Sequence, residues 1–127
     1  MELTLDQALQ QAVAAHREGK LQDAEHLYRA ILQSRPNHPD ANHNLGVLAV
    51  AVGKPLEAVP FFKQALDANP QIEQFWLSYI DTLFKLNKNE EAREIGSQSK
   101  RAGLSSHALE AIEQKIIATD FLNTLRA

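Results

Sequence analysis

Two histidines and an aspartate stand close together in the sequence and could be drawn around a metal ion. His38, Asp40 and His43 supply two imidazoles and one carboxylate, which are ligand types that zinc takes in proteins. A zinc site also needs a fourth ligand and supporting hydrogen-bond partners, and neither is evident nearby. Because Pro39 and Asp40 suit the first turn of a helix, we expect a helix start here and no metal.

The remaining residues offer no set of groups that could act together in catalysis. The sequence contains no cysteine, which removes disulfides, thiol nucleophiles and thiolate metal sites. It has no glycine-rich phosphate loop and no motif that joins a nucleophile, a base and oxyanion donors. We expect His16, His26 and His107 to be surface or partly buried residues. The sequence therefore predicts a protein that is not an enzyme, with no catalytic residue and no cofactor.

Charge and hydropathy exclude two further classes of partner. Among the 127 residues, 44% are apolar and 23% are charged, and the formal net charge is −3. No block is basic, so we expect no nucleic-acid partner. No apolar run approaches the roughly 20 residues that span a bilayer, so we expect no membrane partner. Residues 1–12 lack the cationic start and apolar run of a secretory signal, which favours a cytoplasmic location.

The side chains follow a pattern that repeats at one fixed interval, and this pattern must position any functional group. The interval is 34 residues, the spacing between Ala24 and Ala58 (58 − 24) and again between Ala58 and Ala92 (92 − 58). Further sets matched at this interval are Gly19, Gly53 and Asn87; Lys20, Lys54 and Lys88; Tyr28 and Phe62; Leu32 and Leu66; and Pro36 and Pro70. Self-similarity at a fixed period is the mark of a stacked repeat array.

Apolar residues within each copy recur at helical spacing and predict seven helices. The expected helices run from Leu5 to the Gly19 turn, from Leu21 to Pro36, and over about 40–52, 55–68, 73–86, 90–102 and 106–125. Pro60 should bend the fourth helix without breaking it. Gly96 replaces the aromatic residue of the other copies, so the sixth helix should be the least stable interior element. Gly103 should end that helix and Ser105 should begin the last one.

The second copy resembles a tetratricopeptide repeat in its Leu45-Gly46 pair and in the spacing of the residues that follow it: Gly53, Ala58, Phe62, Ala65 and Pro70. Asn42 stands at the family's tryptophan position and Ala49 at its tyrosine position, whereas the third copy has Trp76. The resemblance implies an all-α fold: a right-handed α-solenoid of three helical hairpins and a capping helix. We expect one domain over 1–127, with repeats at about 5–38, 39–72 and 73–106 and the cap at about 106–125.

Finer features resemble the repeats that precede bacterial glycosyltransferase domains, such as those of O-linked N-acetylglucosamine transferases. They are Asn44 before Leu45-Gly46, the segment 75–81, and the ending Ala102-Gly103-Leu104. The resemblance implies a bacterial interaction module and cannot supply activity, because no transferase domain is present in this sequence. An alternative is the substrate-recruiting amino-terminal part of a larger transferase.

In the tetratricopeptide repeat family the first helix of each pair lines a concave groove that binds peptides or proteins. The resemblance therefore implies that matching positions form a protein- or peptide-binding groove. These are Leu9, Val13, His16 and Arg17; His43, Asn44, Val47 and Val50; and Leu77, Ser78, Asp81, Phe84 and Lys85. Apolar anchors would give affinity and polar side chains would satisfy the backbone of the peptide. The plainer interpretation is that the apolar members pack between helices and the ions are solvated.

Some members of this family hold a terminal carboxylate in a clamp of lysine, asparagine and arginine side chains. The matching positions here carry Leu9, Val13, Asn44, Gln74 and Ser78. Only the asparagine is kept, and one neutral amide cannot replace several charge-assisted hydrogen bonds. The sequence thus disfavours binding to a chaperone tail.

The closing helix offers a rival surface. If it is longer than a cap requires, an apolar patch would remain that favours a homodimer or a self-assembling oligomer. The patch would consist of Ile116, Ile117, Phe121, Leu122 and Leu125. The alternative is that this helix folds back across the third pair.

Overall fold

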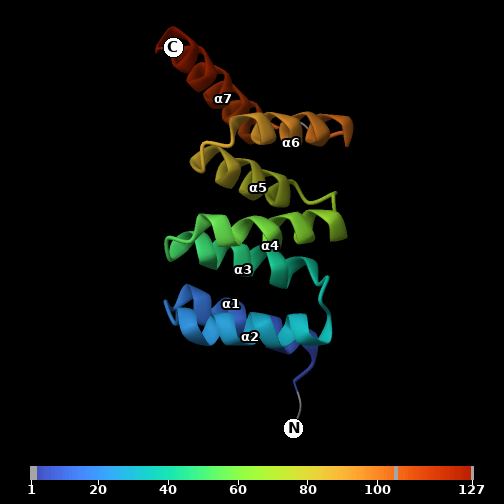
Figure 1. Cartoon of the computed structure of the whole chain (residues 1–127). Coiled ribbons are helices and arrows are strands. Elements are labelled where there is room, and N and C mark those ends of the chain that lie inside the picture. The colour runs from blue at the N-terminus through green and yellow to red at the C-terminus, as the bar shows by residue number, and fades with distance from the viewer. Residues whose placement is uncertain (1–2, 105, 127) are drawn as a thin grey trace. The chain divides into compact units, whose positions relative to one another are not determined.

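The computed structural model describes residues 3–104 and 106–126, and these residues form helices and turns with no strand. Within that range there are seven helices (Figure 1): α1 (Leu5–Arg17), α2 (Leu21–Ser34), α3 (Pro39–Ala51), α4 (Pro55–Ala68), α5 (Glu73–Lys85), α6 (Asn89–Arg101) and α7 (His107–Arg126). The predicted all-α class is confirmed, and the predicted helix boundaries lie within one or two residues of the observed ones. The right-handed superhelix and the single domain stay predictions.

The chain divides into two compact units. Unit one comprises residues 1–69 and unit two residues 70–127. In unit one, α1 pairs with α2, α3 pairs with α4, and α2 packs on α3. In unit two, α5 pairs with α6, and α7 packs on both of them.

One hydrogen-bonded turn ends the first helix of each pair and recurs at the end of α6. In the first pair, Gly19 has a φ of 77°, and the amide of Lys20 donates to the carbonyl of Ala15 at 2.9 Å. Gly53, Asn87 and Gly103 have φ values of 81°, 61° and 86° and make the same arrangement. This is the Schellman motif, in which a left-handed residue satisfies the last carbonyl groups of a helix. The predicted turns at Gly19, Gly53 and Gly103 are confirmed, and Asn87 is the non-glycine residue that best tolerates this conformation.

A side-chain donor ties the start of two first helices to the preceding proline. The indole Nε1–H of Trp76 donates to the carbonyl of Pro70 at 2.8 Å. Asn42, at the matching position of the preceding copy, donates through Nδ2 to the carbonyl of Pro36 at 3.1 Å. Asn42 therefore departs from the family's residue type but makes a hydrogen bond that matches that of Trp76 in the next copy.

Two further helix starts are capped by side chains. Helix α3 begins at Pro39, and Nδ1 of His38 accepts a hydrogen bond from the amide of Ala41 at 3.1 Å, so His38 is a buried N-cap. At α7, the hydroxyl of Ser106 accepts from the amide of Leu109 at 3.1 Å. Ser105, the predicted start, lies outside the described residues. Helix α4 runs unbroken through Pro60, as predicted.

Large and small side chains face each other across the pairs. Ala12 and Gly46 are small, and the aromatic rings at the matching second-helix positions, Tyr28 and Phe62, are 0% and 2% exposed. An added Cβ on Gly46 would lie 2.6 Å from Cε1 of Phe62, so the ring fills the space that the glycine leaves. The third pair reverses the sizes. Ile80, one period after Gly46, is fully buried, and Gly96 takes the place of the ring.

Candidate binding faces

The first candidate face belongs to α1 and α3 of unit one. Leu9 and Val13 on α1 are half-buried, and Arg17 is exposed. Val47 and Val50 on α3 are also half-buried. Their side chains therefore keep part of their apolar surface in solvent, as a binding face requires.

Asn44 on this face belongs to a chain of polar contacts that crosses three helices. Nδ1 of His16 on α1 lies 3.4 Å from the hydroxyl of Tyr28 on α2. Asn44 on α3 forms a hydrogen bond with Tyr28, and its Oδ1 lies 3.4 Å from Nδ1 of His43. Burial raises the pKa of Tyr28 above its ordinary value of 10.0, and the hydrogen bond from Asn44 opposes this rise. The amide of Asn44 thus holds α2 against α3, besides any role toward a ligand.

The sequence assigns His43 to the groove, and this prediction is wrong. The imidazole is buried, and its ring centre lies 5.5 Å from that of Phe62. The reason is helical spacing: His43 precedes Gly46 by three positions, so both lie on the face of α3 that meets α4. His43 is a core residue of unit one.

The burial of His43 predicts that acid destabilises unit one. Burial lowers the pKa of His43 below its ordinary 6.5, although Asn44 and Asp40 oppose the shift. The unfolded chain then binds the proton more tightly, so the stabilisation is complete above pH 6.5 and is lost as pH falls through the folded-state pKa. We expect the free energy of unfolding, measured by urea titration across this range, to fall less steeply with acid in His43→Gln than in the wild type.

The matched control is His26→Gln, which removes an exposed imidazole from α2. It should keep the dependence of the wild type on pH. Equal pH dependence in His43→Gln and the wild type would contradict the assignment of His43 to the core.

The second candidate face lies between α5 and α7 of unit two, where a cleft of about 280 Å³ opens. Leu77, Ser78 and Asp81, which the sequence assigns to the groove, line this cleft. Phe84 is half-buried and does not line the cleft. Lys85 does not line it either, but its ammonium group pairs with Asp81 at 3.0 Å. The structure therefore brings together three of the five residues predicted on α5.

The opposite wall of this cleft is formed by α7, whose part the sequence analysis missed. Its lining residues are Ala108, Ala111, Ile112 and Lys115. Each stands one repeat period after a residue of the α5 wall: Gln74, Leu77, Ser78 and Asp81. Extending the period beyond residue 106 would have found them. Helix α7 thus begins as the first helix of a further repeat.

Comparison with known proteins agrees with this repeat geometry. Two family profiles, both described as Tetratricopeptide repeat, match residues 9–71 and 49–102. The chain belongs to the tetratricopeptide repeat family. No curated protein sequence matches the chain.

Several solved tetratricopeptide repeat structures share the fold. The Sgt2 domain from Aspergillus fumigatus aligns with a TM-score of 0.81 at 18% identity, over 97% of this chain and 82% of that one. The first domain of Spaghetti (RPAP3), bound to an HSP90 peptide, aligns with a TM-score of 0.78 at 17% identity, over 88% and 89% of the two chains. Yeast Tom70 aligns with a TM-score of 0.83 at 20% identity, over 96% of this chain and 25% of that one.

The closing helix of this repeat protein divides into a covered and an uncovered part. Ile116, a predicted member of the self-association patch, is 2% exposed and belongs to the core, because it lies two turns from buried Leu109 on the same side of α7. The other predicted members, Ile117, Phe121, Leu122 and Leu125, are 49%, 64%, 50% and 66% exposed. The alternative, folding back over the third pair, therefore describes α7 as far as Asp120, which contacts Asn89 and Arg93 of α6.

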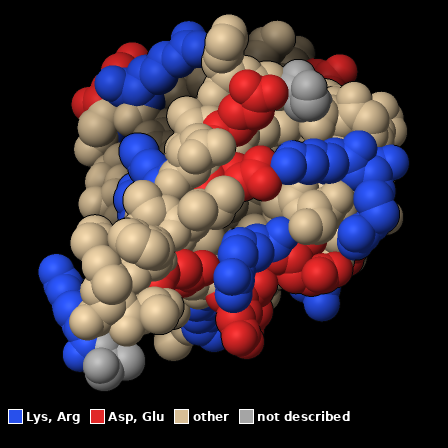
Figure 2. Space-filling model, turned by 90° about the horizontal axis from the view of Figure 1, so that it is seen from above, with Lys and Arg blue, Asp and Glu red and all other residues tan. Residues whose placement is uncertain are grey.

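Charge and metal-binding groups give no further site in the described residues. On the face shown in Figure 2, basic and acidic side chains lie side by side and neither gathers into a patch of one sign. Residues 3–104 and 106–126 contain no group of His, Cys, Asp and Glu side chains that could hold a metal ion. Across the same residues, none of the helices combines the length and apolar character that crossing a membrane requires.

Proposed function

We propose that this chain is a non-enzymatic interaction module that binds a segment of a partner protein. The binding faces lie on the first helices of its repeats, α1, α3, α5 and α7. The observation that supports this proposal best is the cleft between α5 and α7. Its lining combines apolar Leu77 and Ile112 with the polar groups of Ser78, Asp81 and Lys115. Apolar anchors beside polar groups that can satisfy a peptide backbone suit a peptide ligand.

The charges of the cleft favour a segment that places an acidic residue next to an apolar one. Asp81 is already paired with Lys85, whereas Lys115 has no ion pair within the described residues. An acidic group of the ligand would therefore meet Lys115, and the neighbouring apolar side chain would contact Leu77. The cleft, at about 280 Å³, lies at the lower limit of the roughly 300–1,000 Å³ of small-molecule pockets, a size that suits one side chain of a peptide.

The ligand we propose differs from a chaperone tail. The relative RPAP3 is bound to an HSP90 peptide, but the positions of a carboxylate clamp carry Leu9, Val13 and Asn44 in unit one. Asn44 is also engaged with Tyr28 and His43. The alternative function, recruitment of substrates for a larger bacterial transferase, would use the same faces and stays a prediction, as does the cytoplasmic location.

Peptides selected from a displayed random library on the wild-type chain test the proposed face. We expect Leu77→Asp and Lys115→Glu each to weaken binding of the selected peptides by about tenfold or more, which corresponds to about 1.4 kcal/mol. The matched control is Leu56→Asp on α4, because Leu56 is 62% exposed and lies outside the cleft. Peptides that bind both cleft variants as tightly as the wild type would place the binding site elsewhere.

A further inference from the structure

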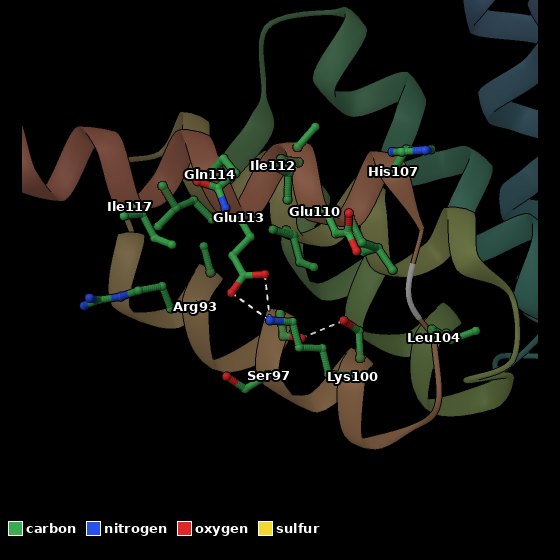
Figure 3. A pocket seen from close by; sticks show the side chains of 17 residues that line it. Arg93, Ser97, Lys100, Leu104, His107, Glu110, Ile112, Glu113, Gln114 and Ile117 are labelled. Carbon is green, nitrogen blue, oxygen red and sulfur yellow. Dashed lines mark hydrogen bonds and ion pairs between the residues drawn. The ribbon is translucent and has the colours of Figure 1, made fainter.

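A second and larger pocket lies on the other side of α7, where α5, α6 and α7 meet within unit two. Its volume is about 710 Å³. Figure 3 shows Lys100 of α6 and Glu113 of α7 joined by an ion pair beside it, at 2.7 Å. The apolar lining is supplied by Ile80, Ala92, Gly96, Ile112, Ile116 and Ile117. Polar and charged side chains such as Arg93, Glu110 and Gln114 complete the lining, and a pocket of this size within a repeat needs a physical cause.

The cause is the missing aromatic ring of the third repeat. At the positions matching Gly96, Tyr28 and Phe62 place their own rings in the space between helices and are almost completely buried. Gly96 places nothing there, and an added Cβ would meet no atom within 4 Å. Ile80 fills part of the volume from α5, and the rest stays open. The pocket thus includes the space of a side chain that this repeat does not provide.

The same unit exposes one aromatic ring. Among the Phe, Tyr and Trp side chains of the described residues, only Phe121 is exposed, and its exposed fraction is 64%. It forms a ridge with Ile117 and Leu125, which are 49% and 66% exposed and stand one helical turn before and after it. Because Ile117 also lines the pocket, the ridge continues into the apolar part of its lining.

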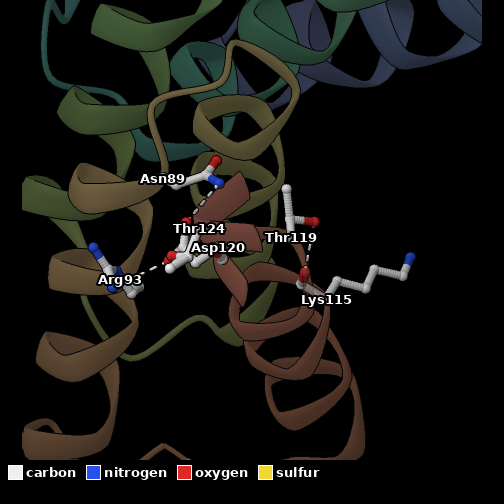
Figure 4. Close-up of polar contacts among 6 residues, drawn as sticks. All are labelled: Asn89, Arg93, Lys115, Thr119, Asp120 and Thr124. Atoms are coloured by element: carbon white, nitrogen blue, oxygen red, sulfur yellow. Dashed lines mark hydrogen bonds and ion pairs between the residues drawn. The ribbon is translucent and has the colours of Figure 1, made fainter. Parts of the chain in front are cut away.

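Phe121 does not enter the pocket of its own chain, because its side chain is exposed and it is not one of the lining residues. It follows Ile116 on the same helix, and the last turns of α7 extend beyond α6 within this unit (Figure 1). The register of α7 is fixed by Asp120, whose Oδ1 accepts from Nδ2 of Asn89 at 3.0 Å and whose Oδ2 pairs with Arg93 at 3.0 Å (Figure 4). These contacts turn Asp120 toward α6, so its neighbour Phe121 lies about 100° further round the helix.

We propose that a second copy of this chain docks on this surface, so that Phe121 of each copy fills the space beside Gly96 of the other. If two α7 helices pair antiparallel about a twofold axis at Ile117, residue 121 of one lies opposite residue 113 of the other. That level is beside the pocket residues Ile112 and Ile116. Such an isologous contact is self-complementary and closes at a dimer. A foreign aromatic side chain could enter the same space, but the chain itself supplies both the ring and the ridge that continues from the pocket.

Sedimentation of the full chain from micromolar to millimolar concentration tests this proposal. We expect a monomer–dimer equilibrium in the wild type. Phe121→Ala removes the ring, and Gly96→Phe fills the pocket from within, so each should raise the dimer dissociation constant by about tenfold or more. Phe121 is exposed, so its replacement leaves the fold intact even if Gly96→Phe fails to fold. Circular dichroism verifies helicity in both variants.

Two matched controls should keep the dissociation constant of the wild type. Gly96→Ala adds only a methyl group to the open space, and Leu56→Ala removes an exposed leucine from unit one. A wild-type chain that stays monomeric throughout would overturn the proposal, as would a Phe121→Ala or folded Gly96→Phe variant that dimerises like the wild type. If the monomer instead binds N-acetylphenylalanine amide with chemical-shift changes at Gly96, the occupant is a foreign aromatic group and the second copy is rejected.

Discussion

Replacing Phe62 with alanine lowers the free energy of unfolding by about 3–5 kcal/mol. The ring is 2% exposed, lies against the backbone of Gly46, and contacts the imidazole of His43. Removing it exchanges a buried aromatic group for a cavity. Gly46 has no side chain that could move into this cavity, and the helix backbones on either side can close it only by giving up their own packing.

Urea unfolding followed by circular dichroism measures this loss. The control is Leu56→Ala on the same helix, whose side chain is 62% exposed, and we expect a change within about 0.5 kcal/mol. A loss below about 1 kcal/mol in Phe62→Ala, well under the usual cost of emptying an aromatic site, would show that the ring is not the central packing element of the second pair.

The helices and their turns follow from the sequence because the period repeats the signals that end each helix. Gly19 and Gly53 precede lysines at the same interval, and their φ values are positive. Asn87 is placed at this position by the period alone, and it adopts the same conformation. A single copy would predict the ends of its helices less reliably. Three copies give the same helix ends at matching positions and so support one another.

Substitutions that act in pairs could not be predicted from single positions. Gly96 stands where the other copies have Tyr28 and Phe62, so by itself it predicts a helix that buries less apolar surface. Its consequence depends on Ile80, which replaces a small residue on the partner helix, so volume is exchanged between helices as well as lost. Likewise Asn42 differs from Trp76 in size but donates the same hydrogen bond. The two copies thus share a hydrogen bond to a backbone carbonyl. The sequence shows the residue that donates it but not the carbonyl that accepts it.

The candidate faces were predicted in part for a similar reason. Leu77, Ser78 and Asp81 line a cleft because their register on α5 repeats the register of the earlier first helices. His43 lies in the core because it shares a side of α3 with Gly46. The opposite wall on α7 is less evident from the sequence, because residues 108–115 keep the spacing of residues 74–81 but not their side-chain types.

We expect Gly46→Ala to lower the free energy of unfolding, although this kind of substitution usually raises it. In the interior of a helix, replacing glycine with alanine normally stabilises by about 0.5–1 kcal/mol. At Gly46, however, the new Cβ would lie 2.6 Å from Cε1 and 2.7 Å from Cδ1 of Phe62. The ring is buried and rigid, so α3 and α4 must separate. We expect a loss of about 1–3 kcal/mol from overpacking, measured as the free energy of unfolding in urea.

The chain contains its own control for this sign. Gly96→Ala is the same substitution inside α6, with no atom within 4 Å of the added Cβ, and it should stabilise by about 0.5–1 kcal/mol. A double-mutant cycle then assigns the loss: with Phe62→Leu the ring is gone, so Gly46→Ala should cost less than it does in the wild type, and the two changes should not add. Additive losses would mean that Gly46 is required by the backbone and not by Phe62. Equal effects at Gly46 and Gly96 would refute the exchange of large and small side chains between the repeats.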